Sequence, residues 1–136
     1  MIFNEYLYKY GLHDCEIDKI SIDDNSILLT FNSGVYILDG NRKETIKTST
    51  CKLHIILALK NTELLEQCVV INLIHRNKIK EVELNEFFNI ISNSKLNIEN
   101  NYYSSFNDSI MIEGYFGQIN YQLKIERISK IIFDFN

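Results

Sequence analysis

The adjacent residues His13 and Asp14 carry the side chains best suited to chemistry. A histidine transfers protons near neutral pH, and a neighbouring carboxylate orients its ring. The same pair also suits a structural role, in which Asp14 caps a turn and His13 packs or hydrogen-bonds nearby. We favour the structural role, and a small enzyme or ligand-binding site at His13 and Asp14 stays open as the alternative.

Cys51 and His54 have the spacing of a pair of metal ligands. Hydropathy alternates along 51–57, which predicts a strand, and residues three apart in a strand point to opposite faces. A zinc site would also need further ligands, and the remaining His and Cys residues form no close pair other than His13 and Cys15. We therefore predict no metal site and no cofactor.

The sequence contains no motif that identifies an enzyme. Residues 114–117, Gly-Tyr-Phe-Gly, lack the Lys and Ser/Thr that follow a phosphate-binding loop, so we predict a turn between strands there. A Gly-x-Ser-x-Gly nucleophile elbow is also missing from the sequence. We expect a protein without catalytic residues.

Aromatic residues gather in the polar stretch 100–108, namely Tyr102, Tyr103 and Phe106. Aromatic side chains in a loop often anchor an interface with a partner. They also fold back over a small core. We favour folding back for these three.

Alternating apolar residues predict strands along most of the chain. Segments 16–23, 27–32 and 35–38 are separated by short polar turns, which predicts a three-stranded meander. Further strands are expected at 51–57, from residue 69, around 96–98 and 110–112, and at 119–126. Segment 119–126 has one apolar and one polar face, and the shift of phase at 127–129 predicts a bulge or bend before the strand pattern resumes.

Two short helices are predicted beside these strands. Phe3, Leu7 and Tyr10 have helical spacing and precede Gly11, a residue that often ends helices. A second apolar stripe predicts a helix over 85–93, and its members are Leu84, Phe87, Phe88 and Ile91. We predict a single domain, 1–136, of the α+β class, mainly antiparallel sheet of about eight strands with two short helices.

Composition and charge restrict the classes of function. The 136 residues are 46% hydrophobic, enough for a core, and carry a net charge of −4, which argues against a nucleic-acid-binding surface. No apolar run of 18 residues is present to span a membrane, and the N-terminal residues lack the pattern of a signal peptide. We expect a cytoplasmic protein with three reduced cysteines and with neither nucleic acid nor membrane as a partner.

A His-Asp dipeptide followed by two short strands stands near the start of the chain. Its residues are Leu12-His13-Asp14-Cys15-Glu16-Ile17, then Lys19-Ile20-Ser21-Ile22, then Ile27-Leu28-Leu29-Thr30-Phe31. This pattern, which covers about the first 30 residues, resembles the start of small bacterial β-rich proteins. Some of those proteins are uncharacterised, and others are assigned to toxin-immunity families.

The resemblance implies an immunity protein that binds a cognate bacterial toxin and blocks its active site or access to its substrate. Many such toxins are nucleases with basic clefts, and an acidic partner is steered towards a basic cleft. The acidic residues we expect to bind are Glu16, Asp18, Asp23 and Asp24. A third possibility is a structural homo-oligomer that associates through a strand edge or the apolar C-terminal run.

Overall fold

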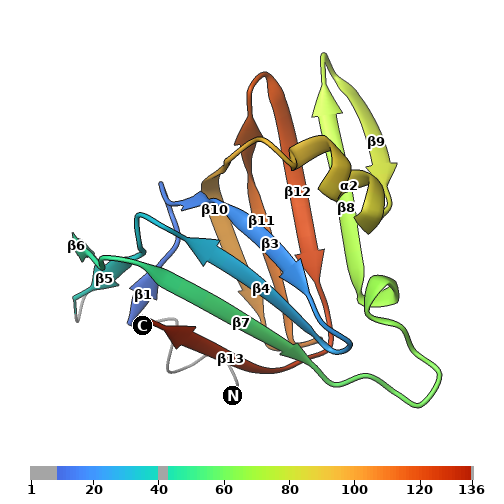
Figure 1. Cartoon of the computed structure of the whole chain (residues 1–136), viewed down its shortest axis with the longest axis horizontal. Helices are drawn as coiled ribbons and strands as arrows, with labels where there is room; N and C mark the ends of the chain where they lie inside the picture. The colour runs from blue at the N-terminus through green and yellow to red at the C-terminus, as the bar shows by residue number, and fades with distance from the viewer. Residues whose placement is uncertain (1–8, 40–42, 136) are drawn as a thin grey trace.

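The computed structural model describes residues 9–39 and 43–135, and antiparallel strands account for most of them (Figure 1). Within these residues, thirteen strands form three sheets. The largest sheet contains, in spatial order, β2 (Glu16–Ile17), β10 (Leu96–Ser104), β11 (Ser109–Phe116), β12 (Ile119–Ile125), β8 (Val69–His75) and β9 (Lys78–Val82). The second contains β13 (Ile128–Asp134), β7 (Cys51–Leu57), β4 (Ser26–Phe31) and β3 (Lys19–Ile22). The smallest contains β1 (Tyr10–Gly11), β5 (Tyr36–Leu38) and β6 (Glu44–Lys47).

The core lies between the four-stranded and the six-stranded sheet, which face each other in Figure 1. Alternate residues of β7 and β12 are buried in this layer, because successive side chains of a strand point to opposite faces. The α-helix α2 (Leu84–Ile91) lies over β8 and β9, and a 3-10 turn, η1 (Leu65–Cys68), precedes β8. The four-stranded sheet ends at β3, so the two sheets do not cover each other fully on that side.

The expectation of mainly antiparallel sheet is confirmed, but about eight strands was too few. The strands that the sequence pattern did not reveal include β1 and β6, which have only two to four residues and therefore little room for alternation. The strand predicted at 16–23 divides into β2 and β3, which belong to different sheets. The predicted helix at 85–93 is confirmed as α2. The predicted N-terminal helix lies mostly outside the described residues, and its last residue, Tyr10, belongs to β1.

The predicted three-stranded meander is wrong in its third strand. β3 and β4 form the expected hairpin, with Ser21 opposite Leu28. β5 does not continue that sheet, because β7 already occupies the other edge of β4. β5 pairs instead with β1 and β6 in the small sheet.

Two expectations for polar or glycine-containing segments also need correction. Residues 114–116 belong to β11, and of the predicted turn at 114–117 only Gly117 lies outside the strand. In the stretch 100–108, Tyr103 packs against the core as expected, but Tyr102 is 53% exposed and Phe106 is 99% exposed at the tip of the β10–β11 hairpin. The hairpin continues to Ser104, which carries the tip beyond the core.

Two further expectations are confirmed, namely that Cys51 and His54 lie on opposite faces of a strand and that a bulge interrupts the strand pattern near 127–129. Cys51 is buried, whereas His54 lies on the other face of β7, with Nε2 3.9 Å from Oδ2 of Asp134. Arg127 has a φ of 59°, and the ladder between β13 and β7 shifts register between Ile128 and Lys130. Because of this bulge, apolar residues of β13 such as Ile131 face the core again.

The three cysteines are free and buried. Because of this burial, we expect the free energy of unfolding to fall at alkaline pH. Burial raises the pKa of the Cys15 thiol from 9.0 to about 11 and that of Cys51 from 9.0 to about 12. The folded protein therefore binds these protons more tightly than the unfolded chain, and the resulting stability is complete below pH 9. It is lost as the pH rises towards 11 and 12, and we expect a loss on the order of 2 kcal/mol for each thiol.

Chemical denaturation at pH 8 and pH 11 tests this expectation. The Cys51→Ala variant should lose less unfolding free energy between the two pH values than the unmodified chain, because it has one thiol fewer to ionise. An equal loss in both proteins would contradict the assignment of the alkaline transition to buried thiols.

Candidate functional site

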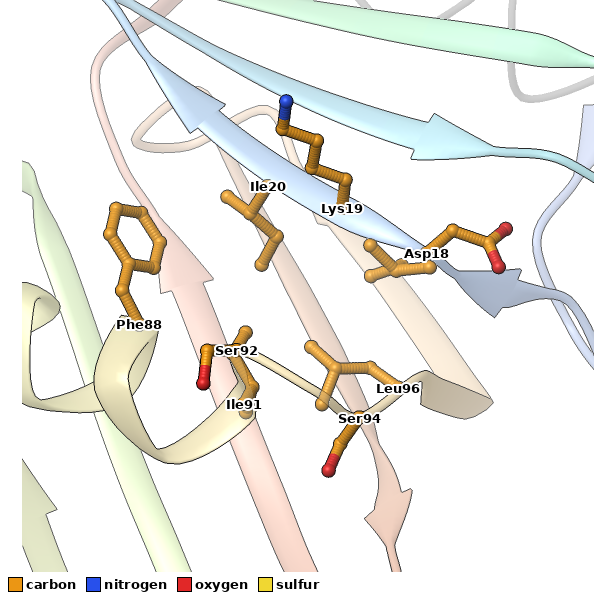
Figure 2. Close-up of a pocket in the computed structure, with 9 residues that line it drawn as sticks. Asp18, Lys19, Ile20, Phe88, Ile91, Ser92, Ser94 and Leu96 are labelled. Atoms are coloured by element: carbon orange, nitrogen blue, oxygen red, sulfur yellow. The ribbon is translucent and has the colours of Figure 1, made fainter.

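A groove runs between the free edge of β3 and the helix α2. Its smaller part has a volume of about 210 Å³ and is lined by residues of β3, α2 and the start of β10. Figure 2 shows Ile20 pointing from β3 towards Phe88 and Ile91 of α2, whereas Lys19 points away from the helix. The larger part, about 970 Å³, extends past η1 and β8 to the end of β9. Ile20 and Phe88 line both parts, so the two parts adjoin at these residues.

The larger part of the groove combines apolar residues with several carboxylates. The apolar residues are Ile20, Ile22, Leu65, Val69, Val70, Ile71, Val82, Leu84 and Phe88. The carboxylates are Glu66 of η1, Glu81 of β9, Glu83 between β9 and α2, and Glu86 of α2. Among the described residues that line this part, none is a lysine or an arginine. A segment that carries apolar and basic side chains would therefore match this surface.

Local structure explains why these residues converge. Phe87 faces the sheet and is fully buried, while Leu84 and Phe88, on the neighbouring face of α2, are half-buried and reach the groove. The Nζ of Lys80 lies 3.1 Å from Oε1 of Glu86 and ties β9 to the helix. This exposed ion pair partly neutralises Glu86, and Glu81 points to the outer face of the sheet because it lies between Lys80 and the buried Val82 in the strand, so Glu66 and Glu83 supply most of the negative charge.

The four acidic residues predicted from the sequence do not form one surface. Asp18 is engaged within the fold, because its side chain is only 8% exposed and its Oδ1 lies 3.3 Å from Nζ of Lys95. Its Oδ2 accepts a hydrogen bond of 2.7 Å from the backbone N–H of Asn32. Glu16 lies in β2, which pairs with β10, and is half-buried. The carboxylate of Asp18 therefore stabilises the fold by binding Lys95 and the backbone of Asn32.

Asp23 and Asp24 are placed differently. They are exposed in the turn between β3 and β4, which closes with a 2.9 Å bond from the N–H of Asp23 to the carbonyl of Ser26. Asp23 directly follows Ile22, which lines the groove. Two of the four predicted residues thus extend the acidic surface at one end of β3.

His13 and Asp14 meet a third residue that the sequence argument did not include. Nδ1 of His13 lies 3.3 Å from Oδ2 of Asp14 and 3.2 Å from Oε1 of Glu44. Asp14 has a φ of 63°, and the turn closes with a bond from the N–H of Cys15 to the carbonyl of Leu12. The three side chains offer one nitrogen and two oxygen atoms within 4.8 Å of one another.

Such a donor set suits Zn²⁺ or another divalent transition metal. All three residues are exposed, and the imidazole nitrogen already contacts both carboxylates, so hydrogen bonding accounts for the arrangement. Neither His13 nor Asp14 lines the groove. The structure therefore places these two residues in a surface cluster separate from the groove.

Comparisons with protein-family models, with curated proteins and with solved structures found no match for the chain. Among the described residues, no helix has both the length and the apolar character needed to cross a membrane. Assignment of a function consequently depends on the geometry and charge of the groove.

The groove was not predicted from the sequence because its carboxylates are distant along the chain. Glu66 belongs to η1, whereas Glu81 belongs to a strand that pairs with β8. Glu83 follows the end of β9, where the strand pattern no longer says which way a side chain points. Only the fold shows that Glu66 and Glu83 line the same groove as the edge of β3.

Proposed function

We propose that this chain is a non-catalytic protein-binding domain, an immunity protein that neutralises a cognate bacterial toxin. The observation that carries the proposal is the groove between β3 and α2, with apolar residues along it and glutamates around it. A toxin with a basic cleft would be attracted by these carboxylates, and its apolar residues would find a surface to bury against. Residues 12–31 resemble the start of small bacterial β-rich proteins, some of which are assigned to toxin-immunity families, and this resemblance supports the same proposal.

The proposal is tested by producing the chain together with the toxin domain encoded beside its own gene. We expect the chain to restore growth of cells that make the toxin, and the purified proteins to form a complex. Reversing two groove charges, with Glu66→Lys and Glu83→Lys, should weaken that complex by about a hundredfold, since close charge pairs at interfaces are worth roughly 1.5 kcal/mol or more each.

A matched control is Glu99→Lys compared with Glu83→Lys. Both glutamates are exposed, but Glu99 belongs to β10, which lies three strands away from β8 and the groove. The Glu99 variant should bind the toxin as the unmodified chain does. Failure of the unmodified chain to protect cells, or equal affinity of both lysine variants, would refute the proposal.

A further inference from the structure

The free edge of β3 forms one wall of the groove. β3 is the last strand of the four-stranded sheet, and no strand of the described residues pairs with its outer edge. An unpaired strand edge presents backbone N–H and C=O groups that a further strand is able to bind. A partner is therefore able to form backbone hydrogen bonds with this edge in addition to side-chain contacts.

The hairpin register identifies the backbone groups that face outwards. Asp23 donates its N–H to Ser26, so this pair is hydrogen-bonded, and bonded and non-bonded pairs alternate along an antiparallel ladder. Ser21 consequently bonds to β4, whereas Ile20 and Ile22 direct their N–H and C=O groups to the free edge. Both isoleucines line the larger part of the groove.

The space beside this edge suits an added strand. Strands in a sheet lie about 4.8 Å apart, and the groove of about 970 Å³ begins at β3 itself. Beneath it the six-stranded sheet continues with β8 and β9, which the four-stranded sheet does not cover. Alternate side chains of an added strand would face the half-buried Val69 of β8, and the others would point away from the core.

We propose that the groove holds an extended basic segment of the partner, which adds to the edge of β3 as a fifth strand of that sheet. This inference rests on the proposed function and specifies how the toxin would be bound. Apolar side chains of the segment face β8, and its lysine or arginine side chains are attracted by the exposed carboxylates of Glu66 and Glu83, which line the groove. A second copy of the chain fits less well, because its own β3 carries a single basic residue, Lys19, and is followed by Asp23 and Asp24.

The first experiment uses an acetylated and amidated peptide, Lys-Val-Lys-Val-Lys-Val-Lys, as the probe. Hydrogen exchange followed by NMR should show the amides of Ile20 and Ile22 exchanging at least about tenfold more slowly with peptide present, because they gain partners. The amide of Ser21, already bonded to β4, should change little. Peptide binding without protection of Ile20 and Ile22 would overturn strand addition.

A protein variant removes one outward donor without disturbing β4. Proline is tolerated in an edge strand where its missing N–H faced outwards, so Ile22→Pro should keep the β3–β4 hairpin. We expect this variant to bind the peptide about tenfold more weakly, and Ile22→Val, which retains the N–H, to change affinity less than about threefold. Equal affinity of the two variants would contradict the inference.

A peptide-side test covers the case in which Ile22→Pro fails to fold. Two versions of the peptide carry N-methyl groups on alternate amides, so that each has one blocked edge. One version should lose binding and the other should retain it, because only one edge of the segment faces β3. Retention of binding by both would overturn strand addition.

The toxin experiment separates this inference from the proposed function. Loss of toxin affinity in the Glu83→Lys variant with none in Ile22→Pro would overturn strand addition and leave the proposed function in place. Failure of the unmodified chain to protect cells would refute the proposed function, while the peptide result would still stand. Protection of Ile20 and Ile22 without peptide, together with a dimer in sedimentation, would identify a second copy as the occupant and overturn the basic segment.

Discussion

Replacement of Gly114 by alanine is expected to lower the free energy of unfolding by about 3 kcal/mol or more. Gly114 lies in β11 opposite Ile98, where the ladder between β10 and β11 shifts register. A β-carbon there would overlap the carbonyl oxygen of Asn97, a backbone atom that has no rotamer with which to move aside. The same oxygen accepts a 3.0 Å hydrogen bond from the buried hydroxyl of Tyr121, so its displacement would also break that bond.

Urea denaturation of Gly114→Ala and Gly117→Ala provides the measurement and its control. Gly117 has a φ of +58°, and no atom lies within 4 Å of the position its β-carbon would occupy. Alanine at 117 should therefore cost only the strain of the left-handed conformation, about 1 kcal/mol. A larger loss in Gly117→Ala than in Gly114→Ala would show that β10 and β11 do not approach as closely as described.

Replacement of Phe87 by alanine is the second change with a large expected effect. Phe87 is fully buried, and its ring centroid lies 6.3 Å from that of Tyr121. Removal of such a ring costs about 3–5 kcal/mol. Because α2 has only eight residues, it depends on this packing to persist. We expect Phe87→Ala to lose both stability and affinity for the partner, since α2 forms one wall of the groove.

The neighbouring substitution Phe88→Ala separates these two effects. Phe88 is half-buried and lines the groove, so its removal should lower the unfolding free energy by about 1–2 kcal/mol while weakening binding. Thermal or urea unfolding gives the stabilities, and calorimetric titration with the partner gives the affinities. If Phe88→Ala proved more destabilising than Phe87→Ala, the orientation of α2 on the sheet would be wrong.

The parts of the fold that the sequence predicts are those in which one face of an element is buried. β7 and β12 alternate because one face meets the core, and α2 shows a stripe for the same reason. Residues 99–101 of β10 gave no such signal, because all three are polar and sit at a register shift. The pairing of β5 with β1 and β6 was also unpredictable, since it depends on β7 occupying the edge of β4 that β5 would otherwise bind.

The candidate site was less predictable than the fold. Hydropathy alternation says which residues are exposed, but it does not say which exposed residues are neighbours. Asp18 illustrates the difference, because a carboxylate that looked free in the sequence is held by Asn32 and Lys95. Glu44 illustrates the converse, since it reaches His13 from a strand 31 residues further along the chain.

The order in which β7 gains its neighbours has a consequence for synthesis of the protein. β4 precedes β7 in the chain, whereas β13, its other neighbour, follows after five further strands and α2. During synthesis, one edge of β7 therefore stays unpaired until residues 128–134 have emerged from the ribosome. Pairing at such sequence separation folds slowly, and an apolar strand with an open edge is exposed to other chains in the meantime.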